Sequence, residues 1–541
     1  MLLRQYAQSY PEIAVLVEVG ESVSSRAITG LRVSAQPDEE EAEPEIRIIG
    51  GIHGNECQSV EEVLLIIEWL LAGYQTDAQL TSFIDGVEFL LIPLVNPDGF
   101  SSSPPTRTNA NYVDLNRNFG FGWSQQSVFE PFSEPESRAI RDVSQAGAFN
   151  LGLSYHTESI YVNGPWNYTP FHPRDDALID AIGDSYKADS EYEVVFGWDW
   201  YQISGDVNDW SLGTQGTFDW TIELTDGDDA VWEVHEPALR AFISWAFVGV
   251  SGAVIDAQTG LPLHAMITVE PEGEPVFTDA TKGDYHRILL NGTYEVTAWA
   301  PGYRPLTVEN VTVAESVTTV DFALTRKAAY TAGFQVNEMT LPRDISNSYV
   351  ALVGYDNDSI ASDALGVHDG YWYSIGAGGD ITIDMGAAIA VEDAPGPDLL
   401  VASGTRSNDS ARVWVADHQD GPFVEAAVGS GDLYVDLSDL NLAAVRYVKV
   451  VDESDVAFNE AGSGYDLDAV ENLSWRVLAP PDGDTESDFP DYDSDTMLPD
   501  TDTQPDSDNR NVAATQSHAV SGCTMTPQHP AFTLFSLLFA N

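Results

Sequence analysis

His53 and Glu56 stand three residues apart in the glycine-rich stretch Gly50-Gly51-Ile52-His53-Gly54-Asn55-Glu56. From one turn the two side chains can point the same way and bind a single metal ion. Zn²⁺ accepts imidazole nitrogens and carboxylate oxygens, and a catalytic zinc site needs a third protein ligand plus an open position for water. The same spacing is also typical of a helix start with solvated polar residues, so the pair alone leaves both interpretations open.

Two predicted elements position this turn. Residues 46–49 are a β-branched run typical of a buried strand, and residues 60–71 have the length and apolar content of a mostly buried helix. Further along the chain, residues 87–95 and 149–155 are also strand-like. Helices that alternate with such strands predict an α/β layer fold.

His156 and Glu223 are candidates for the rest of a metal centre. His156 follows the strand-like residues 149–155, a rigid place from which to offer a third zinc ligand. Glu223 stands among apolar residues in the run 221–224, where its carboxylate needs a partner because burying it alone is costly. A metal-activated water is one such partner. A hydrogen-bonded structural histidine and a carboxylate paired with arginine are the alternatives.

Other polar residues suit the recognition of an anionic group. Arg107, Asn116 and Arg117 offer guanidinium and amide groups. Arginine binds a carboxylate through two parallel hydrogen bonds, and a second arginine can stabilise developing oxyanion charge. Tyr201 presents a phenol on a loop that contains Gly205 and is placed to close over a substrate. A turn with an ion pair and ordinary packing of the tyrosine are the alternatives.

In this order and spacing, the chain resembles the zinc metallocarboxypeptidase family over nearly all of residues 1–247. The resemblance rests on the stretch 53–56 (HGNE), Arg107, the stretch 113–119 (VDLNRNF), His156, Tyr201 and Glu223. The forms of the two stretches are similar to those of the carboxypeptidase D, E and N branch.

The resemblance implies a zinc-dependent peptidase. It implies that His53, Glu56 and His156 hold one Zn²⁺. Glu223 would take a proton from the metal-activated water and later pass it to the leaving amine, and Arg107 would stabilise the oxyanion.

The resemblance also implies how a substrate binds. Asn116 and Arg117 would bind the terminal carboxylate, which restricts cleavage to the last residue, and Tyr201 would cover the bound chain. The expected partners are therefore the C-termini of peptides or proteins.

The preferred C-terminal side chain is less well specified. The branch typically prefers Arg or Lys and has an acidic residue where this chain has Asn167. In the Tyr201 loop, Asp206 stands in place of a glycine and Asn208 in place of a glutamine. Asp206 either restores attraction for a basic side chain or faces solvent. We expect a slight preference for basic residues.

The chain divides into five predicted parts. The predicted fold is an α/β domain with a mixed sheet flanked by helices, followed by two all-β sandwiches and a disordered acidic tail. Residues 248–326 form short alternating strands with glycine turns and resemble the transthyretin-like domain of this branch. The parts are the catalytic domain 1–247, the transthyretin-like sandwich 248–326, a sandwich at 330–476, an acidic linker at 477–515 and a tail at 516–541.

The third part resembles discoidin-like or jelly-roll modules of bacterial surface proteins. Asp466 and Asp468 are candidate Ca²⁺ ligands there, with a solvated turn as the alternative. A ligand at the cell surface is the partner expected for this module. The tail resembles a bacterial surface-sorting segment without its terminal basic cluster.

Composition limits the partners further. The formal net charge of -63 at pH 7 would repel nucleic acid and anionic lipid. No stretch is long and apolar enough to span a bilayer. The first residues lack the apolar core of a signal peptide and are typical of an amphipathic helix, so the natural start can lie upstream. We nevertheless expect a secreted or cell-surface protein.

Three functions are compatible with these patterns. The first is a zinc carboxypeptidase that trims C-terminal residues from peptides. The second is a peptidase for cell-wall peptides, because related zinc folds cut such substrates. The third is a surface adhesion protein whose catalytic domain is inactive, and the intact set of candidate ligands argues against it.

Overall fold

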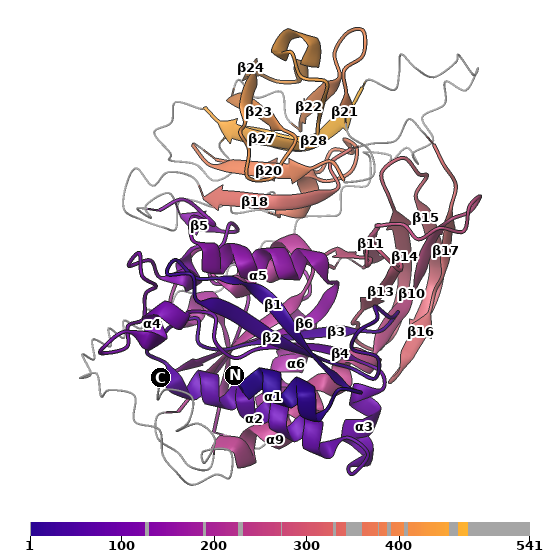
Figure 1. The fold of residues 1–541 in the computed structure, drawn as a ribbon. Coiled ribbons are helices and arrows are strands. Elements are labelled where there is room, and N and C mark those ends of the chain that lie inside the picture. Colours follow the sequence, from indigo (N-terminus) through magenta and orange to yellow (C-terminus); the bar gives the residue numbers. More distant parts are fainter. Residues whose placement is uncertain are drawn as a thin grey trace, which may run out of the picture.

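The computed structural model describes residues 2–124, 129–187, 191–225, 231–271, 273–327, 332–341, 360–376, 378–386, 391–404, 409–453 and 464–473. The linker predicted at 477–515 and the tail predicted at 516–541 lie outside these residues. Figure 1 shows three parts, which are named here the α/β domain (2–247), the middle β segment (249–326) beside it, and the distal β segment (332–473) above it.

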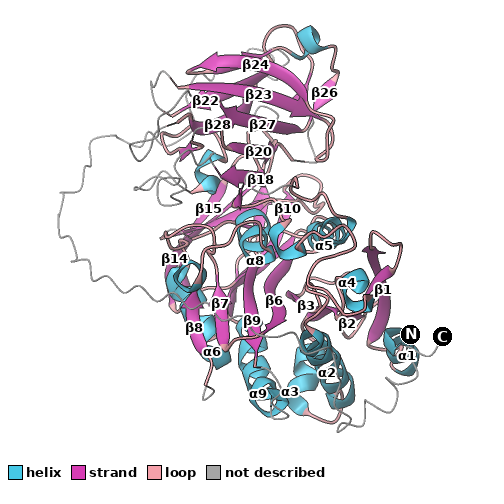
Figure 2. Ribbon diagram, turned by 90° about the vertical axis from the view of Figure 1, so that its left-hand side faces the viewer, coloured by secondary structure: helices cyan, strands magenta, loops and turns pink. Residues whose placement is uncertain are grey.

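The α/β domain is built on one eight-stranded mixed sheet with the strand order β1-β2-β4-β3-β6-β9-β7-β8. β4, β3, β6 and β9 run parallel to one another at the centre of the sheet and are buried along their whole length. Figures 1 and 2 show α2, α3 and α9 on one side of the sheet and α5 on the other. Central strands covered on both faces need nearly continuous apolar sequence, which is what residues 46–49 and 149–155 provide.

The elements of this domain follow in chain order. The strands are β1 (Ala14–Glu21), β2 (Ala27–Val33), β3 (Glu45–Ile49), β4 (Glu88–Ile92), β5 (Trp123–Ser124), β6 (Phe149–Thr157), β7 (Tyr161–Gly164), β8 (Glu193–Phe196) and β9 (Phe218–Leu224). The helices are α1 (Leu2–Ser9), α2 (Cys57–Gly73), α3 (Ala78–Ile84), α4 (Pro97–Ser101), α5 (Pro135–Ala146), α6 (Asp176–Lys187), α7 (Gly197–Trp200), α8 (Val207–Trp210) and α9 (Val231–Ser244). Short helical turns lie at Leu115–Arg117, Ser211–Gln215 and Trp245–Phe247.

The mixed α/β fold predicted for this part is confirmed, with shifts at the ends of elements. The helix predicted at 60–71 begins three residues earlier, at Cys57, and continues to Gly73. The strand predicted at 149–155 continues to Thr157 and therefore includes His156. The strand predicted at 87–95 is confined to Glu88–Ile92.

The other two parts contain only β-sheets and short helical turns among the described residues. The middle β segment has two four-stranded sheets made from β10 (Gly249–Asp256), β11 (Met266–Glu270), β12 (Val276–Phe277), β13 (Asp284–Arg287), β14 (Gly292–Trp299), β15 (Leu306–Val313), β16 (Val317–Thr319) and β17 (Phe322–Leu324). The sheets of the distal β segment are made from β18 (Gln335–Leu341), β19 (Tyr373–Ser374), β20 (Asp380–Asp384), β21 (Val391–Glu392), β22 (Leu399–Ser403), β23 (Ser410–Ala416), β24 (Val424–Ser430), β25 (Leu433–Val435), β26 (Ala444–Val445), β27 (Tyr447–Asp452) and β28 (Asp466–Asn472).

Both β segments are attached to the α/β domain. The short strand β5 extends a sheet of the distal β segment by pairing parallel with β18, so that Trp123 lies opposite Thr340. Arg287 of the middle β segment donates to Asp175 at 2.6 Å, and both side chains are buried. None of the described helices combines the length and hydropathy needed to cross a bilayer.

Candidate active site

The carboxyl ends of three neighbouring parallel strands bring the predicted residues together. His53 and Glu56 lie in the turn after β3, His156 lies near the end of β6, and Glu223 lies near the end of β9. β6 stands between β3 and β9, and its pairing with β9 sets His156 directly opposite Glu223. This edge of a parallel sheet is where open α/β folds bind ligands.

Tight packing fixes the turn that carries the first two residues. A Cβ atom at Gly54 would collide with the backbone of Gly99 and Phe100, so only glycine fits there. Ser59, in the first turn of α2, donates from Oγ to the carbonyl oxygen of Glu56 at 2.6 Å and accepts from the Gly51 amide at 3.0 Å. Gly54 therefore allows a close approach between two loops.

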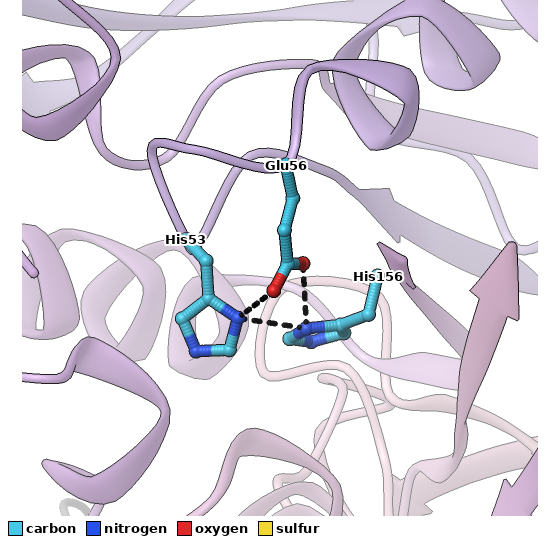
Figure 3. Close-up of side chains that lie close together, drawn as sticks. All are labelled: His53, Glu56 and His156. Carbon is cyan, nitrogen blue, oxygen red and sulfur yellow. Dashed lines mark hydrogen bonds and ion pairs between the residues drawn. The ribbon is translucent and has the colours of Figure 1, made fainter. Parts of the chain in front are cut away.

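His53, Glu56 and His156 converge on one point (Figure 3). Their ligand atoms all lie within 4.8 Å of one another, and the three side chains are buried. The Nδ1 atoms of the two histidines are 3.1 Å apart, Glu56 Oε1 is 2.7 Å from His53 Nδ1, and Glu56 Oε2 is 3.1 Å from His156 Nδ1. Two imidazole nitrogens and a carboxylate that face each other at this spacing fit the ligand set of a zinc ion.

The outer nitrogen of each histidine has its own partner. His53 Nε2 lies 3.1 Å from Asp114 Oδ1, and His156 Nε2 lies 3.2 Å from Ser154 Oγ. Asp114 also accepts from Arg107 Nε at 2.9 Å. Such outer contacts fix the ring orientation and the tautomer that leaves the inner nitrogen free for a metal.

Burial and neighbouring charges shift the pKa values of Glu56 and Glu223 in opposite directions. Burial disfavours the charged form of Glu56, but His53 and His156 outweigh it, so the pKa of Glu56 lies well below its usual range. Burial raises the pKa of Glu223 well above its usual range, and the negative charge of Glu56 adds to the effect. Two carboxylates with separated pKa values at one site are typical of a division between a charged ligand and a proton-transfer group.

Comparison with known proteins agrees with this geometry. The family model described as zinc carboxypeptidase matches residues 1–243, and that of the carboxypeptidase regulatory-like domain matches residues 249–325. The chain therefore contains a zinc carboxypeptidase domain at residues 1–243. It is 33% identical to carboxypeptidase D of Mus musculus over 373 residues, which is 61% of this chain and 26% of that protein. It is 29% identical to carboxypeptidase SOL1 of Arabidopsis thaliana over 352 residues, covering 60% of this chain and 70% of that protein.

Among solved structures, carboxypeptidase A from Helicoverpa armigera aligns at 24% identity with a TM-score of 0.39. The alignment covers 44% of this chain and 69% of that one. The chain thus spans about a quarter of the length of the carboxypeptidase D relative and about two thirds of the length of the other two proteins.

Among the residues predicted to act on a substrate, Arg107 is in direct contact with a candidate zinc ligand. Arg107 lies beside Glu56, with Nη1 3.4 Å from Oε1. Asn116 and Arg117 form the short helical turn after Asp114, and Arg117 Nη1 donates to the Asn116 carbonyl oxygen at 2.6 Å. Tyr201 ends the short helix α7 and is 46% exposed, so its ring stands at the protein surface.

Asp206 and Asn208 are both buried, at 1% and 0% exposure. Asp206 caps α8 by accepting from the Asp209 amide at 2.9 Å, and burial raises its pKa to about 7. The alternative in which Asp206 faces solvent is therefore wrong. Asn208 Oδ1 accepts from Thr221 Oγ1 at 3.0 Å, while its Nδ2 has no hydrogen-bond partner among the described residues.

Two functional contacts escaped the sequence analysis. Asp114, which joins His53 to Arg107, was quoted there only as part of a motif. Asp209 accepts from the backbone and side-chain amides of Asn167 at 2.9–3.1 Å. These hydrogen bonds hold Asn167 in place, at the position where the carboxypeptidase D, E and N branch typically has an acidic residue. An aspartate just before a short helical turn is a local capping signal, but its contact with a histidine 61 residues away has no sequence signature.

The candidate Ca²⁺ ligands of the distal β segment already have protein partners. Asp466 accepts from Ser374 Oγ at 2.6 Å. Asp468 accepts from the amides of Asp369 and Gly370 at 3.0 and 3.2 Å. Among the described residues, neither carboxylate belongs to a group of three that could hold a metal ion.

Proposed function

We propose that this chain is an active zinc carboxypeptidase that removes single residues from the C-termini of peptides or proteins, with a slight preference for basic residues. The observation that carries the proposal is the convergence of His53 Nδ1, His156 Nδ1 and the Glu56 carboxylate beside the buried Glu223. The three side chains would hold Zn²⁺. When bound, the metal polarises the scissile carbonyl and lowers the pKa of water from about 15.7 toward about 7.

The protein's own groups would divide the remaining work. Glu223, whose raised pKa favours proton uptake, takes a proton from the attacking water and delivers it to the leaving amine. Arg107, held by Asp114, directs its guanidinium toward the charge that develops on the carbonyl oxygen. Asn116 and Arg117 bind the terminal carboxylate, and Tyr201 covers the bound chain from the rim.

The basic preference rests on Asp206. Its carboxylate is buried at the start of α8. The positive charge of Arg117, which we propose binds the terminal carboxylate of the substrate, lowers the pKa of Asp206 against the larger effect of burial. Since the pKa of Asp206 is about 7, the group becomes negatively charged in neutral and alkaline solution. A negative group at this depth attracts the guanidinium or ammonium of a C-terminal Arg or Lys.

The remaining sequence predictions concern the rest of the chain. Secretion or surface display, a cell-surface ligand for the distal β segment and Ca²⁺ at Asp466 and Asp468 stay predictions, as do the boundaries of the five parts.

The test combines one variant with a substrate panel. Glu223→Gln removes the proton acceptor and keeps the shape, so kcat should fall by roughly 10²- to 10⁴-fold while the zinc content is unchanged. Peptides that differ only in their last residue, with cell-wall peptides included, measure the substrate class. A fully active Glu223→Gln enzyme would contradict the assigned mechanism. Turnover of wall peptides alone, or of no peptide by the zinc-loaded protein, would instead support the wall-peptide or adhesion alternatives.

A further inference from the structure

Carboxylates gather where the α/β domain meets the middle β segment, at the opposite end of β3 from the turn that carries His53 and Glu56. They come from the loop before β3, from the starts of β3 and β4, and from the turn that leads into β13. The members, named here the junction cluster, are Glu40, Glu43, Glu45, Glu88, Asp279 and Asp284, and each acts electrostatically on at least one other.

Cationic side chains compensate little of this charge. Arg32 Nε lies 3.0 Å from Glu88 Oε1, and the exposed Lys282 acts on Glu40. His286 Nε2 lies 3.3 Å from Asp284 Oδ2. Yet Glu45, Glu88, Asp279 and Asp284 are each at least 93% buried. Buried carboxylates in proteins are normally paired with a cation or coordinated to a metal, because an isolated buried charge is very costly.

Three members of the junction cluster lie close enough together to share one metal ion. One carboxylate oxygen from each of Glu40, Glu45 and Asp279 lies within 4.8 Å of the others. Glu45 Oε1 accepts from the Ala148 amide at 2.9 Å, which anchors one side of the cluster in the α/β domain. Asp279 Oδ1 accepts from the amides of Thr281 and Lys282 at 2.8 and 2.6 Å, which anchors the other side in the middle β segment.

Asp284 provides a separate sign that a ligand belongs here. Its Oδ1 atom is buried and has no hydrogen-bond partner among the described residues, and the residue is 7% exposed. The Asp279 amide donates to the Asp284 carbonyl oxygen at 2.8 Å, so the two residues face each other across the turn. Asp284 also acts electrostatically on Glu40, which places it near the group of three carboxylates.

We propose that Glu40, Glu45 and Asp279 bind one Ca²⁺, with Asp284 beside them as a further ligand. Ca²⁺ takes six to eight oxygen ligands at about 2.3–2.6 Å, so two oxygens on the same ion can be up to about 5 Å apart. The three oxygens lie within 4.8 Å of one another, which is compatible with that limit. An all-carboxylate set disfavours zinc, and Mg²⁺ requires near-ideal octahedral geometry at about 2.0–2.1 Å. The ion fastens the middle β segment to the α/β domain.

A second acidic group, formed by Asp393, Asp398 and Asp436, serves as a control, because both oxygens of one of its carboxylates already have backbone partners. Both oxygens of Asp398 accept backbone amides at 2.8 Å, from Ala394 and Leu437. Its central carboxylate is thus satisfied by the protein itself.

The experiment compares Ca²⁺ binding and thermal unfolding of the full chain in three forms. These are the native protein, the junction variant Glu40→Gln/Asp279→Asn and the control variant Asp393→Asn/Asp436→Asn. Each is passed over a chelating resin, reloaded with zinc and titrated with Ca²⁺ by calorimetry and by a thermal unfolding scan. Asn at position 279 keeps the oxygen that accepts the two backbone amides, and circular dichroism checks the fold.

At a Ca²⁺ concentration about a hundredfold above Kd, we expect the native Tm to rise by about 3–5 °C. The junction variant should bind one ion fewer and lose this rise, whereas the control variant should keep both. The proposal would be overturned if Ca²⁺ left the Tm of the native protein unchanged. It would also be overturned if the Tm of the junction variant rose equally with Ca²⁺, or if Mg²⁺ raised the native Tm as much as Ca²⁺ does. Neither readout is hydrolysis, so this result is independent of the proposed peptidase activity.

Discussion

Asp114→Asn tests whether the hydrogen bond between Asp114 and the outer nitrogen of His53 strengthens zinc binding. In the structure, Asp114 Oδ1 accepts from His53 Nε2 and from the Asn116 amide, both at 3.1 Å, and Oδ2 accepts from Arg107 Nε at 2.9 Å. An amide of the same shape has one accepting oxygen and one NH₂ group. Whichever way the amide is turned, its NH₂ group faces at least one of these three donors.

The size of the effect follows from those contacts. Loss of the outer partner of a metal-bound histidine typically costs roughly 10- to 100-fold in metal affinity. That range corresponds to about 1.4–2.8 kcal/mol. A part of the loss should also appear in kcat at saturating zinc, because Arg107 loses its orientation.

Competition with a chromophoric chelator measures the zinc affinity, and peptide hydrolysis at saturating zinc measures kcat. Asp142→Asn is a matched control, because Asp142 also accepts from an arginine Nε at 2.9 Å but on the surface. It should leave both quantities unchanged. If Asp114→Asn binds zinc as tightly as the native protein, the contact with His53 does not position the ligand and the reasoning fails.

Three further predictions concern specificity, stability and the rim of the site. Asp206→Asn should lower kcat/KM for C-terminal Arg relative to Leu by about 10- to 100-fold, and should remove a rise in this ratio around pH 7; an unchanged ratio would exclude Asp206 from recognition. Burial raises the pKa of Glu62 from 4.5 to about 8, so the folded state holds a proton that the unfolded state releases and native stability falls as pH rises between these values. Glu62→Gln should therefore gain about 2–4 kcal/mol over the native protein at pH 9 but little near pH 4.5 in urea unfolding, and a gain independent of pH would contradict this. Tyr201→Phe should raise KM several-fold with an unchanged Tm, because the ring is 46% exposed, and a lower Tm would show a structural role instead.

The sequence by itself determined the α/β fold, the family and the order of the chemical groups. Periodicity and glycine turns are local signals, so they placed the strand before His53 and the helix after Glu56 to within a few residues. They could not show that the helix begins at Cys57 or that β6 extends through His156, because packing against neighbouring elements decides where an element ends.

Only the tertiary structure decided which distant groups touch. The register between β6 and β9 sets Glu223 opposite His156, and the packing of two loops brings Asp114 to His53. Burial, which sequence pattern does not report for an isolated aspartate, turned Asp206 from a solvent-facing candidate into a group with a pKa near 7. Electrostatic energies depend on distances and burial in the folded chain. The sequence therefore predicted which residue types form the site, but not the pKa values or interaction energies of those residues.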